Sequence, residues 1–312
     1  MLDPHFEAML KAEAAQQPAE APPLTALPLE VLRGFYVQTR QGQNLKTSPA
    51  EVATRDLQVA GAQGELDARL YSPPGVEARS ALLVYFHGGG WVIGNLETHD
   101  AHCRRLALHS GAQVLAIDYR LAPEHPFPAG HDDALAAVRW AFDHAGEISV
   151  DPGRIGVGGD SAGGNLAACV SLDLRGDPAR SLRLQLLLYP ATGPAQRTPS
   201  RESRDGPVLS RAAMDFFEAS LAADKHPEGR RAFPAQAASH AGLPPAIVVT
   251  AGFDPLEDEG RDYAELLTRA GGQAQHVSYP GLVHDFFIMG DVSPAVLIAA
   301  EETGRAIALA LA

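Results

Sequence analysis

The stretch that decides the fold is Gly159-Asp160-Ser161-Ala162-Gly163, a G-x-S-x-G pattern near the middle of the 312-residue chain. An apolar strand pattern, Ile155 to Val157, runs into it, and a helical pattern, Asn165 to Leu174, follows it. A serine on such a sharp strand-to-helix turn adopts a strained backbone and projects its hydroxyl from the edge of the sheet. The pattern therefore predicts Ser161 as a nucleophile, flanked by glycines because larger side chains there would collide with neighbouring backbone.

Outward from this turn, short apolar runs alternate with helical patterns. Two alternating stretches, 52–59 and 65–71, predict antiparallel strands that meet at a turn around Gly61–Gly64. Further strands are expected at 81–86, 114–118, 154–157, 184–189, 246–250 and 275–279, and helices at 98–109, 129–145, 162–174, 257–270 and 294–311. This alternation indicates an α/β fold with a mostly parallel central sheet flanked by helices. Ligands of such sheets bind beyond the carboxyl ends of the strands.

Two regions lie outside this alternation. Helices are expected at 3–16 and about 28–40, before any strand, with a break between them at Pro18, Pro22 and Pro23. The stretch between Leu188 and Ile247 holds a polar loop, 193–207, and a helix near 210–222, but no strong strand. Insertions of that length are usually functional. We therefore expect residues 1–50 and 191–240 to form a two-part helical cap on a core made of 51–190 and 241–312.

The general base is expected beyond the nucleophile, since the chain order in a fold with this turn is serine, acid, histidine. Four histidines follow Ser161, namely His226, His240, His276 and His284. Only His284 lies in the loop between the last predicted strand and the last predicted helix, at the edge where Ser161 is expected. We therefore predict His284 as the base that accepts the serine proton.

The carboxylate that orients the histidine should end the preceding strand. Asp254 lies in the loop after the strand at 246–250, whereas Asp258 comes one helical turn later and suits a solvated or capping position. Asp285 is adjacent to His284 and is poorly placed to reach its Nδ1. Asp254 is therefore favoured over Asp258.

A glycine run, His87-Gly88-Gly89-Gly90-Trp91, follows the strand at 81–86. Glycines let the backbone approach a ligand closely, and preorganised N–H groups stabilise the oxyanion that forms when a carbonyl is attacked. The predicted donors are the N–H groups of Gly88, Gly89 and Ala162. The alternative, a phosphate-binding loop, lacks both G-x-G-x-x-G and a P-loop lysine.

The charge of the chain disfavours two classes of function. The formal net charge is −13, which disfavours binding to nucleic acid or to anionic membranes.

Cys103 and Cys169 lie in helical patterns and are expected to be buried side chains. No run of 18 apolar residues occurs, and residues 1–17 lack a signal-peptide core, so we expect a cytoplasmic protein. His99 and His102 share a helix face, but no third ligand is evident, and we expect no metal.

The chain contains five motifs in this order: His87–Trp91, Asp118–Ala129, Gly158–Leu166, Asp254–Leu256 and His284–Phe286. Together they resemble those of the hormone-sensitive-lipase-like (family IV) bacterial carboxylesterases, which have the α/β-hydrolase fold. The turn at Ser161, Gly159–Gly163, resembles that of their subgroup with Asp after the first Gly, the GDSAG subgroup. The resemblance implies a serine carboxylesterase that hydrolyses small-molecule esters with short to medium acyl chains through an acyl-enzyme, without a cofactor. Dimers are frequent in that family.

The motifs leave other functions open. An amidase, a peptidase or an acyltransferase could use the same triad, and a non-catalytic ligand-binding protein could use the same scaffold, as the gibberellin receptors do. We expect Arg120 and Glu124, in the proline-stiffened stretch that ends at Ala129, to brace the glycine run or the helix after Ser161. Candidate pocket walls are apolar residues for which core packing is the commoner alternative, namely Trp91, Leu209, Phe216, Phe217 and Phe286.

Overall fold

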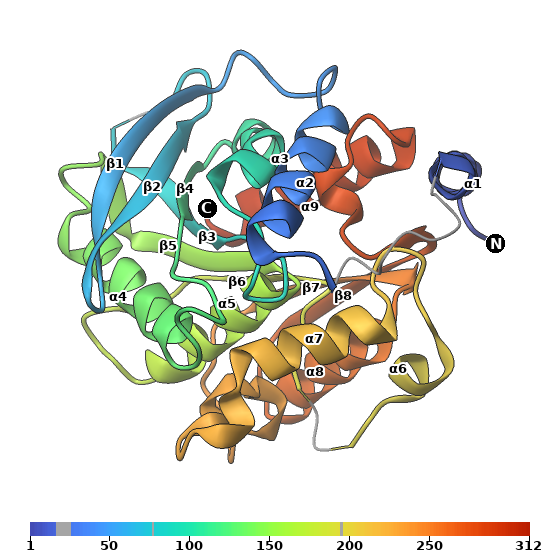
Figure 1. Cartoon of the computed structure of the whole chain (residues 1–312). Helices are drawn as coiled ribbons and strands as arrows, with labels where there is room; N and C mark the ends of the chain where they lie inside the picture. The colour runs from blue at the N-terminus through green and yellow to red at the C-terminus, as the bar shows by residue number, and fades with distance from the viewer. Residues whose placement is uncertain (17–25, 77, 194–195) are drawn as a thin grey trace.

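The computed structural model describes residues 1–16, 26–76, 78–193 and 196–312. Its centre is an eight-stranded sheet in the order β1-β2-β4-β3-β5-β6-β7-β8 (Figure 1). The β1–β2 and β2–β4 pairs are antiparallel, and all later pairs are parallel. The strands are β1 (Ala53–Gly61), β2 (Gly64–Ser72), β3 (Ser80–Phe86), β4 (Gln113–Ile117), β5 (Val150–Asp160), β6 (Gln185–Leu188), β7 (Ala246–Phe253) and β8 (Ala274–Val283).

Helices cover both faces of this sheet, which is why its inner strands are continuously apolar. Every residue of β3 is buried, with Leu82 and Val84 in the core on one face and Leu83 and Tyr85 in the core on the other. One core includes residues of α4 (Ala129–Asp143), α5 (Ala162–Asp173) and α8 (Glu257–Arg269). The other includes residues of α3 (Leu96–Ser110) and α9 (Pro294–Ala310). The same two layers are visible in Figure 1.

The predicted α/β architecture is confirmed, and the strand and helix positions agree to within a few residues. The largest differences are at β5, which begins at Val150 rather than near 154, and at β8, which continues to Val283. The proline break at 18–23 lies outside the described residues. Within the part of the chain that the structure describes, no helix is long and apolar enough to cross a membrane.

Among the described residues, seven helices lie outside the alternation, and the first of them, α1 (Pro4–Gln16), packs through Phe6 into the core that includes α3 and α9. The others are α2 (Leu29–Gly42), α6 (Pro199–Ser203), α7 (Arg211–Leu221) and the short helices η2 (Ala223–Lys225), η3 (Gly229–Ala232) and η4 (Pro234–Gln236). Leu32 and Tyr36 of α2 form one apolar cluster with Val92 and Ile93, and Phe216 and Phe217 of α7 pack against it. This contact supports a two-part cap, and the boundaries 1–50 and 191–240 stay a prediction.

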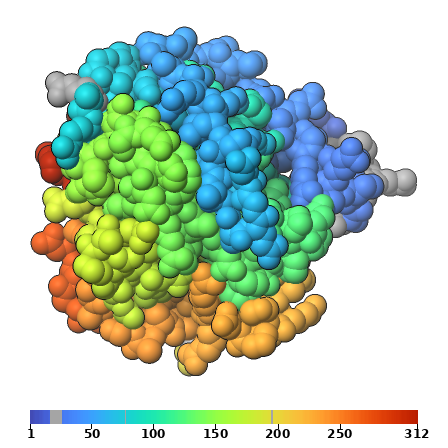
Figure 2. All heavy atoms as spheres, turned by 90° about the vertical axis from the view of Figure 1, so that its left-hand side faces the viewer, coloured from blue at the N-terminus to red at the C-terminus, as the bar shows by residue number. Residues whose placement is uncertain are grey.

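Arg120 and Glu124, which follow β4, contact other elements than we expected. Arg120 forms an ion pair with Asp133 of α4, and Asp133 also accepts the N–H of Ala62, in the β1–β2 turn, at 3.0 Å. The β1–β2 hairpin and α4 lie side by side on the face that Figure 2 shows. Glu124 instead pairs with Arg33 of α2 at 2.8 Å. The expectation that these residues brace the glycine run or α5 is therefore wrong for Arg120. Glu124 acts through Arg33, whose Nε–H donates to the carbonyl of Val92, directly after the glycine run, at 2.9 Å.

Candidate active site

Ser161 lies on the turn between β5 and α5, with a positive φ of 54° that is rare for a residue other than glycine. Both neighbouring glycines are sterically required. A Cβ at Gly159 would lie 2.3 Å from the carbonyl carbon of Gly163, and one at Gly163 would lie 2.0 Å from the carbonyl oxygen of Phe86. The local sequence therefore permits this strained turn where other residues would prevent it.

The three predicted catalytic side chains meet at the carboxyl ends of the strands. His284 Nε2 lies 2.9 Å from Ser161 Oγ, and His284 Nδ1 lies 2.7 Å from Asp254 Oδ2. The other carboxylate oxygen, Asp254 Oδ1, accepts the N–H of Leu256 at 2.8 Å. Ser161 keeps 7 % of its surface exposed, while Asp254 is fully buried. A nucleophile, a base and an orienting acid in this geometry can carry out acyl transfer.

The electrostatics of His284 follow from the carboxylates around it. Burial has the largest influence and would lower its pKa, but the charges of Asp254 and then Asp285 outweigh it and raise the pKa to about 9. The positive form of the imidazole is therefore stabilised, which favours the imidazolium formed when the serine proton is taken.

The glycine run differs from our expectation at its first member. The N–H of Gly88 donates to Asp160 Oδ1 at 3.0 Å, so it is directed away from the pocket. This corrects the prediction of Gly88 as an oxyanion donor. Gly89 and Gly90 have φ values of 110° and 60°, and Ala162 is the first residue of α5. The N–H groups of these three residues donate to no acceptor within the described ranges.

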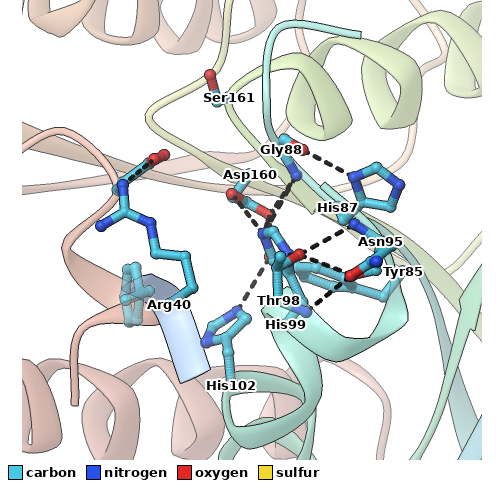
Figure 3. Close-up of polar contacts among 12 residues, drawn as sticks. Arg40, Tyr85, His87, Gly88, Asn95, Thr98, His99, His102, Asp160 and Ser161 are labelled. Atoms are coloured by element: carbon cyan, nitrogen blue, oxygen red, sulfur yellow. Dashed lines mark hydrogen bonds and ion pairs between the residues drawn. The ribbon is translucent and has the colours of Figure 1, made fainter. Parts of the chain in front are cut away.

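Asp160 anchors a buried polar cluster beneath the glycine run. Besides Gly88, its carboxylate accepts the hydroxyl of Tyr85 at 2.8 Å and lies 3.2 Å from His99 Nε2. Burial would raise the pKa of Asp160, but the neighbouring His99 outweighs it and holds the pKa well below its usual range. Figure 3 shows these side chains converging on Asp160 while Ser161 points away from them. The cluster ties the glycine run to the nucleophile turn.

The alternative acid, Asp258, and the two histidines considered as metal ligands, His99 and His102, have other partners than the catalytic residues. Asp258 accepts the N–H of Ser200 at 2.7 Å and pairs with Arg261, away from His284. His99 faces Asp160, whereas His102 Nε2 lies 3.0 Å from the hydroxyl of Tyr85, so the two histidines have different partners.

A cavity of about 430 Å³ lies next to the nucleophile turn. Ser161 itself does not line the cavity. Ala191 and Asn165 do line it, and both donate their backbone N–H groups to the carbonyl of Ser161. Its apolar wall includes Trp91, Leu221 and Phe233. Polar side chains line another part of it, namely Arg197, Arg201, Glu218, Asp224, Gln236 and Glu259.

Of the five apolar side chains considered for the pocket wall, Trp91 lines this cavity. Phe217 lies over the glycine run, because a Cβ at Gly90 would meet its ring. Phe216 is half-buried beside it. Leu209 packs with Met214 and Leu256, and Phe286 is fully buried between aromatic rings of the sheet core. For Phe286 the structure therefore favours core packing, and this corrects its assignment to the pocket, whereas the assignment of Leu209 stays a prediction.

Sequence reasoning missed Asp160 and Tyr119 as supports of the site. The hydroxyl of Tyr119 donates to the carbonyl of His87 at 2.8 Å, and its ring stacks on the His87 ring. A signal was available for Asp160, because a charged residue inside an otherwise small and apolar turn must find buried partners. Tyr119 carried no comparable signal.

Comparison with known proteins gives consistent results. A family model described as the α/β-hydrolase fold matches residues 83–288. Carboxylesterase NlhH of Mycobacterium tuberculosis is 41 % identical over 284 residues, which are 88 % of each chain. Ethyl acetate hydrolase of Pseudomonas putida is 34 % identical over 300 residues, 93 % of each chain. The solved structure of ester-hydrolase EH1AB1 from the metagenome of Lake Arreo has a TM-score of 0.93 at 40 % identity, covering 99 % of both chains.

Proposed function

The chain belongs to the α/β-hydrolase family and, within it, to the hormone-sensitive-lipase-like carboxylesterases. From this membership and the geometry of the site, we propose that Ser161, His284 and Asp254 are its catalytic residues. The protein is a serine-dependent carboxylic ester hydrolase. Asp160 supports its placement in the GDSAG subgroup.

In the acylation step, His284 Nε2 takes the proton of Ser161 while Oγ attacks the ester carbonyl carbon. The carbonyl oxygen becomes an oxyanion, and the N–H groups of Gly89, Gly90 and Ala162 are the proposed donors. Each such donor contributes about 3–4 kcal/mol to the stability of the transition state. The carbon–oxygen bond to the alcohol then breaks, and the imidazolium returns its proton to the departing oxygen.

In the deacylation step, water takes the place of the alcohol. His284 removes a proton from the water as it attacks the acyl carbon, and the same donors hold the second oxyanion. The bond to Ser161 Oγ breaks, Oγ regains the proton, and the carboxylic acid leaves. Asp254 keeps Nδ1 protonated throughout, so that Nε2 faces Ser161 as an acceptor.

The cavity beside Trp91 is the proposed site for the acyl chain. Its volume of about 430 Å³ suits a short to medium chain, and its wall at Trp91, Leu221 and Phe233 is apolar. The polar side chains elsewhere in the lining limit how much apolar chain it can bury without leaving polar groups unsatisfied.

The observation that carries the proposal is the continuous contact from Asp254 through His284 to Ser161, at 2.7 and 2.9 Å. Ser161→Ala should lower kcat for p-nitrophenyl butyrate by about 10⁴-fold or more without changing the folded structure. The matched control is Ser171→Ala, since Ser171 lies in α5 and, among the described residues, its hydroxyl donates to the carbonyl of Ala167 in the same helix. Unchanged turnover by Ser161→Ala would refute the assignment.

A second comparison separates ester hydrolysis from the other uses of the same triad. Matched p-nitrophenyl ester and anilide substrates distinguish an esterase from an amidase or peptidase, and analysis of products formed with added alcohol detects acyl transfer. The relatives compared above are named for ester hydrolysis, so we expect the ester to be the better substrate and water the main acceptor.

We also propose where the enzyme acts and in which oligomeric state. It acts in the cytoplasm on small-molecule esters, and it forms a homodimer. Light scattering of the purified protein measures its mass against 33.0 kDa for one chain, and a monomer at all accessible concentrations would exclude the dimer.

A further inference from the structure

Asp285, the residue after His284, has its carboxylate against the catalytic imidazole. Its Oδ1 lies 3.5 Å from His284 Nε2, the same nitrogen that lies 2.9 Å from Ser161 Oγ. Asp285 adopts a left-handed conformation with φ of 65° at the start of η5 (Phe286–Ile288), yet its carboxylate accepts no N–H from that helix. Aspartate in such a position usually caps the helix. Here the carboxylate is turned elsewhere.

The carboxylate is turned toward α2, which comes from the far end of the chain. Asp285 Oδ2 accepts an N–H of Arg40 at 3.0 Å and the hydroxyl of Tyr36 at 3.2 Å. Arg40 and Tyr36 are one helical turn apart, and the guanidinium lies 4.9 Å from the centre of the Tyr36 ring. The side chains of Arg40 and Asp285 are only 8 % and 10 % exposed, so solvent screens this ion pair weakly. Arg40 is shown in Figure 3.

The two oxygens of this carboxylate have unequal surroundings. Oδ2 has both partners from α2, whereas Oδ1 is buried with no hydrogen-bond partner among the described residues. Removing the positive charge of Arg40 would leave a buried carboxylate whose nearest cation is a protonated His284. An imidazolium held at Oδ1 would direct its Nε2–H away from Ser161, because one N–H cannot align well with both acceptors.

Other charged and titratable groups also face the imidazole. They are Asp254 from the loop after β7, Asp160 at the end of β5, and the ring of Tyr189 after β6, 4.9 Å away. Asp254 and Asp160 are held by hydrogen bonds within the core of the sheet. Asp285 differs because its counter-charge comes from α2, outside the sheet.

We propose that Arg40 and Tyr36 are positioning residues that hold the carboxylate of Asp285 on α2, so that docking of this helix keeps His284 Nε2 directed at Ser161. We call these three residues the Asp285 latch. Through these contacts, α2 influences the protonation and direction of the catalytic base. The inference rests on the proposed roles of Ser161 and His284.

The test is the pH dependence of kcat/KM for p-nitrophenyl butyrate. In Arg40→Met, His284 becomes the counter-ion of Asp285, so the acidic limb should move up by about one unit or more. Below that limb kcat/KM should fall about tenfold, as one pKa unit requires. In Asp285→Asn the negative charge is lost while an acceptor for Arg40 and Tyr36 remains, so the limb should move down. Arg40→Met/Asp285→Asn should regain the turnover that Arg40→Met loses.

The matched control is Arg33→Met on the same helix. Arg33 pairs with Glu124 and donates to the carbonyls of Val92 and Ala122, so its loss removes other contacts of α2 while Arg40 and Tyr36 still hold Asp285. The acidic limb of Arg33→Met should stay where it is in the wild type. Equal shifts in Arg33→Met and Arg40→Met, or an unmoved limb in both Arg40→Met and Asp285→Asn, would overturn the latch.

If Arg40→Met does not fold, the pH dependence of two other variants still tests the proposal. Tyr36→Phe removes one hydrogen bond to Asp285 and should raise the limb slightly, and Asp285→Asn should still lower it; an unmoved limb in both overturns the proposal. Wild-type turnover that is abolished by Ser161→Ala supports the proposed function separately. A negative result with the latch variants in that situation counts against the latch alone.

Discussion

Asp254→Asn tests the orienting carboxylate with a change of one atom. The N–H of Leu256 donates to Asp254 Oδ1 at 2.8 Å, so the amide oxygen of an asparagine must occupy that position. Its NH₂ group then occupies the position of Oδ2, 2.7 Å from His284 Nδ1. Facing a donor, Nδ1 must become the acceptor, and the proton of the neutral imidazole moves to Nε2. His284 would then present an N–H to Ser161 and could not accept its proton.

The expected loss is that of a triad with the wrong tautomer, about 10⁴-fold in kcat, or about 5.4 kcal/mol. The assay is turnover of p-nitrophenyl butyrate across pH, together with thermal unfolding of the variant. The pKa of His284 should also fall, since Asp254 has the largest effect among the three carboxylates whose charges raise it. The acidic limb of whatever activity remains should therefore lie lower than in the wild type.

Asp258→Asn is the control, because Asp258 was the alternative acid. Its contacts are with Ser200 and a half-exposed Arg261, and we expect kcat within about twofold of the wild type. Asp254→Asn with more than a tenth of wild-type kcat, or a comparable loss in Asp258→Asn, would refute the reasoning.

In the wild type, kcat/KM should rise from about pH 6.5 to about pH 9. Burial would lower the pKa of His284, but Asp254 and Asp285 outweigh it and raise the pKa to about 9, and only the neutral imidazole accepts a proton. A profile already level at pH 6.5 would contradict this. Ala219→Trp should shift acyl preference to shorter p-nitrophenyl esters, since Ala219 lines the cavity from an exposed position on α7. Ala212→Trp, on the same helix but away from the cavity, is its control; identical chain-length profiles would exclude this cavity as the acyl site.

The sequence was sufficient for the fold and for the identity of the three catalytic candidates, for local reasons. Strands buried on both faces must be continuously apolar, and helices between them must be amphipathic, so both leave periodic patterns. Parallel strands bring their carboxyl ends to one edge, so the residues after β5, β7 and β8 had to lie near one another. The strained turn at Ser161 is likewise local, because the glycines that permit it are two residues away on either side.

Only the tertiary structure decided which N–H groups, carboxylates and rings of the site already have partners within the protein. The N–H of Gly88 is taken by Asp160, 72 residues later, and the carboxylate of Asp285 by Arg40, 245 residues earlier. The ring of Phe286 is enclosed in the core by Tyr189 and Phe287. Pairings between residues so far apart leave no period or spacing in the chain. The direction of an N–H or a carboxylate depends on such partners, and only the folded molecule brings them together.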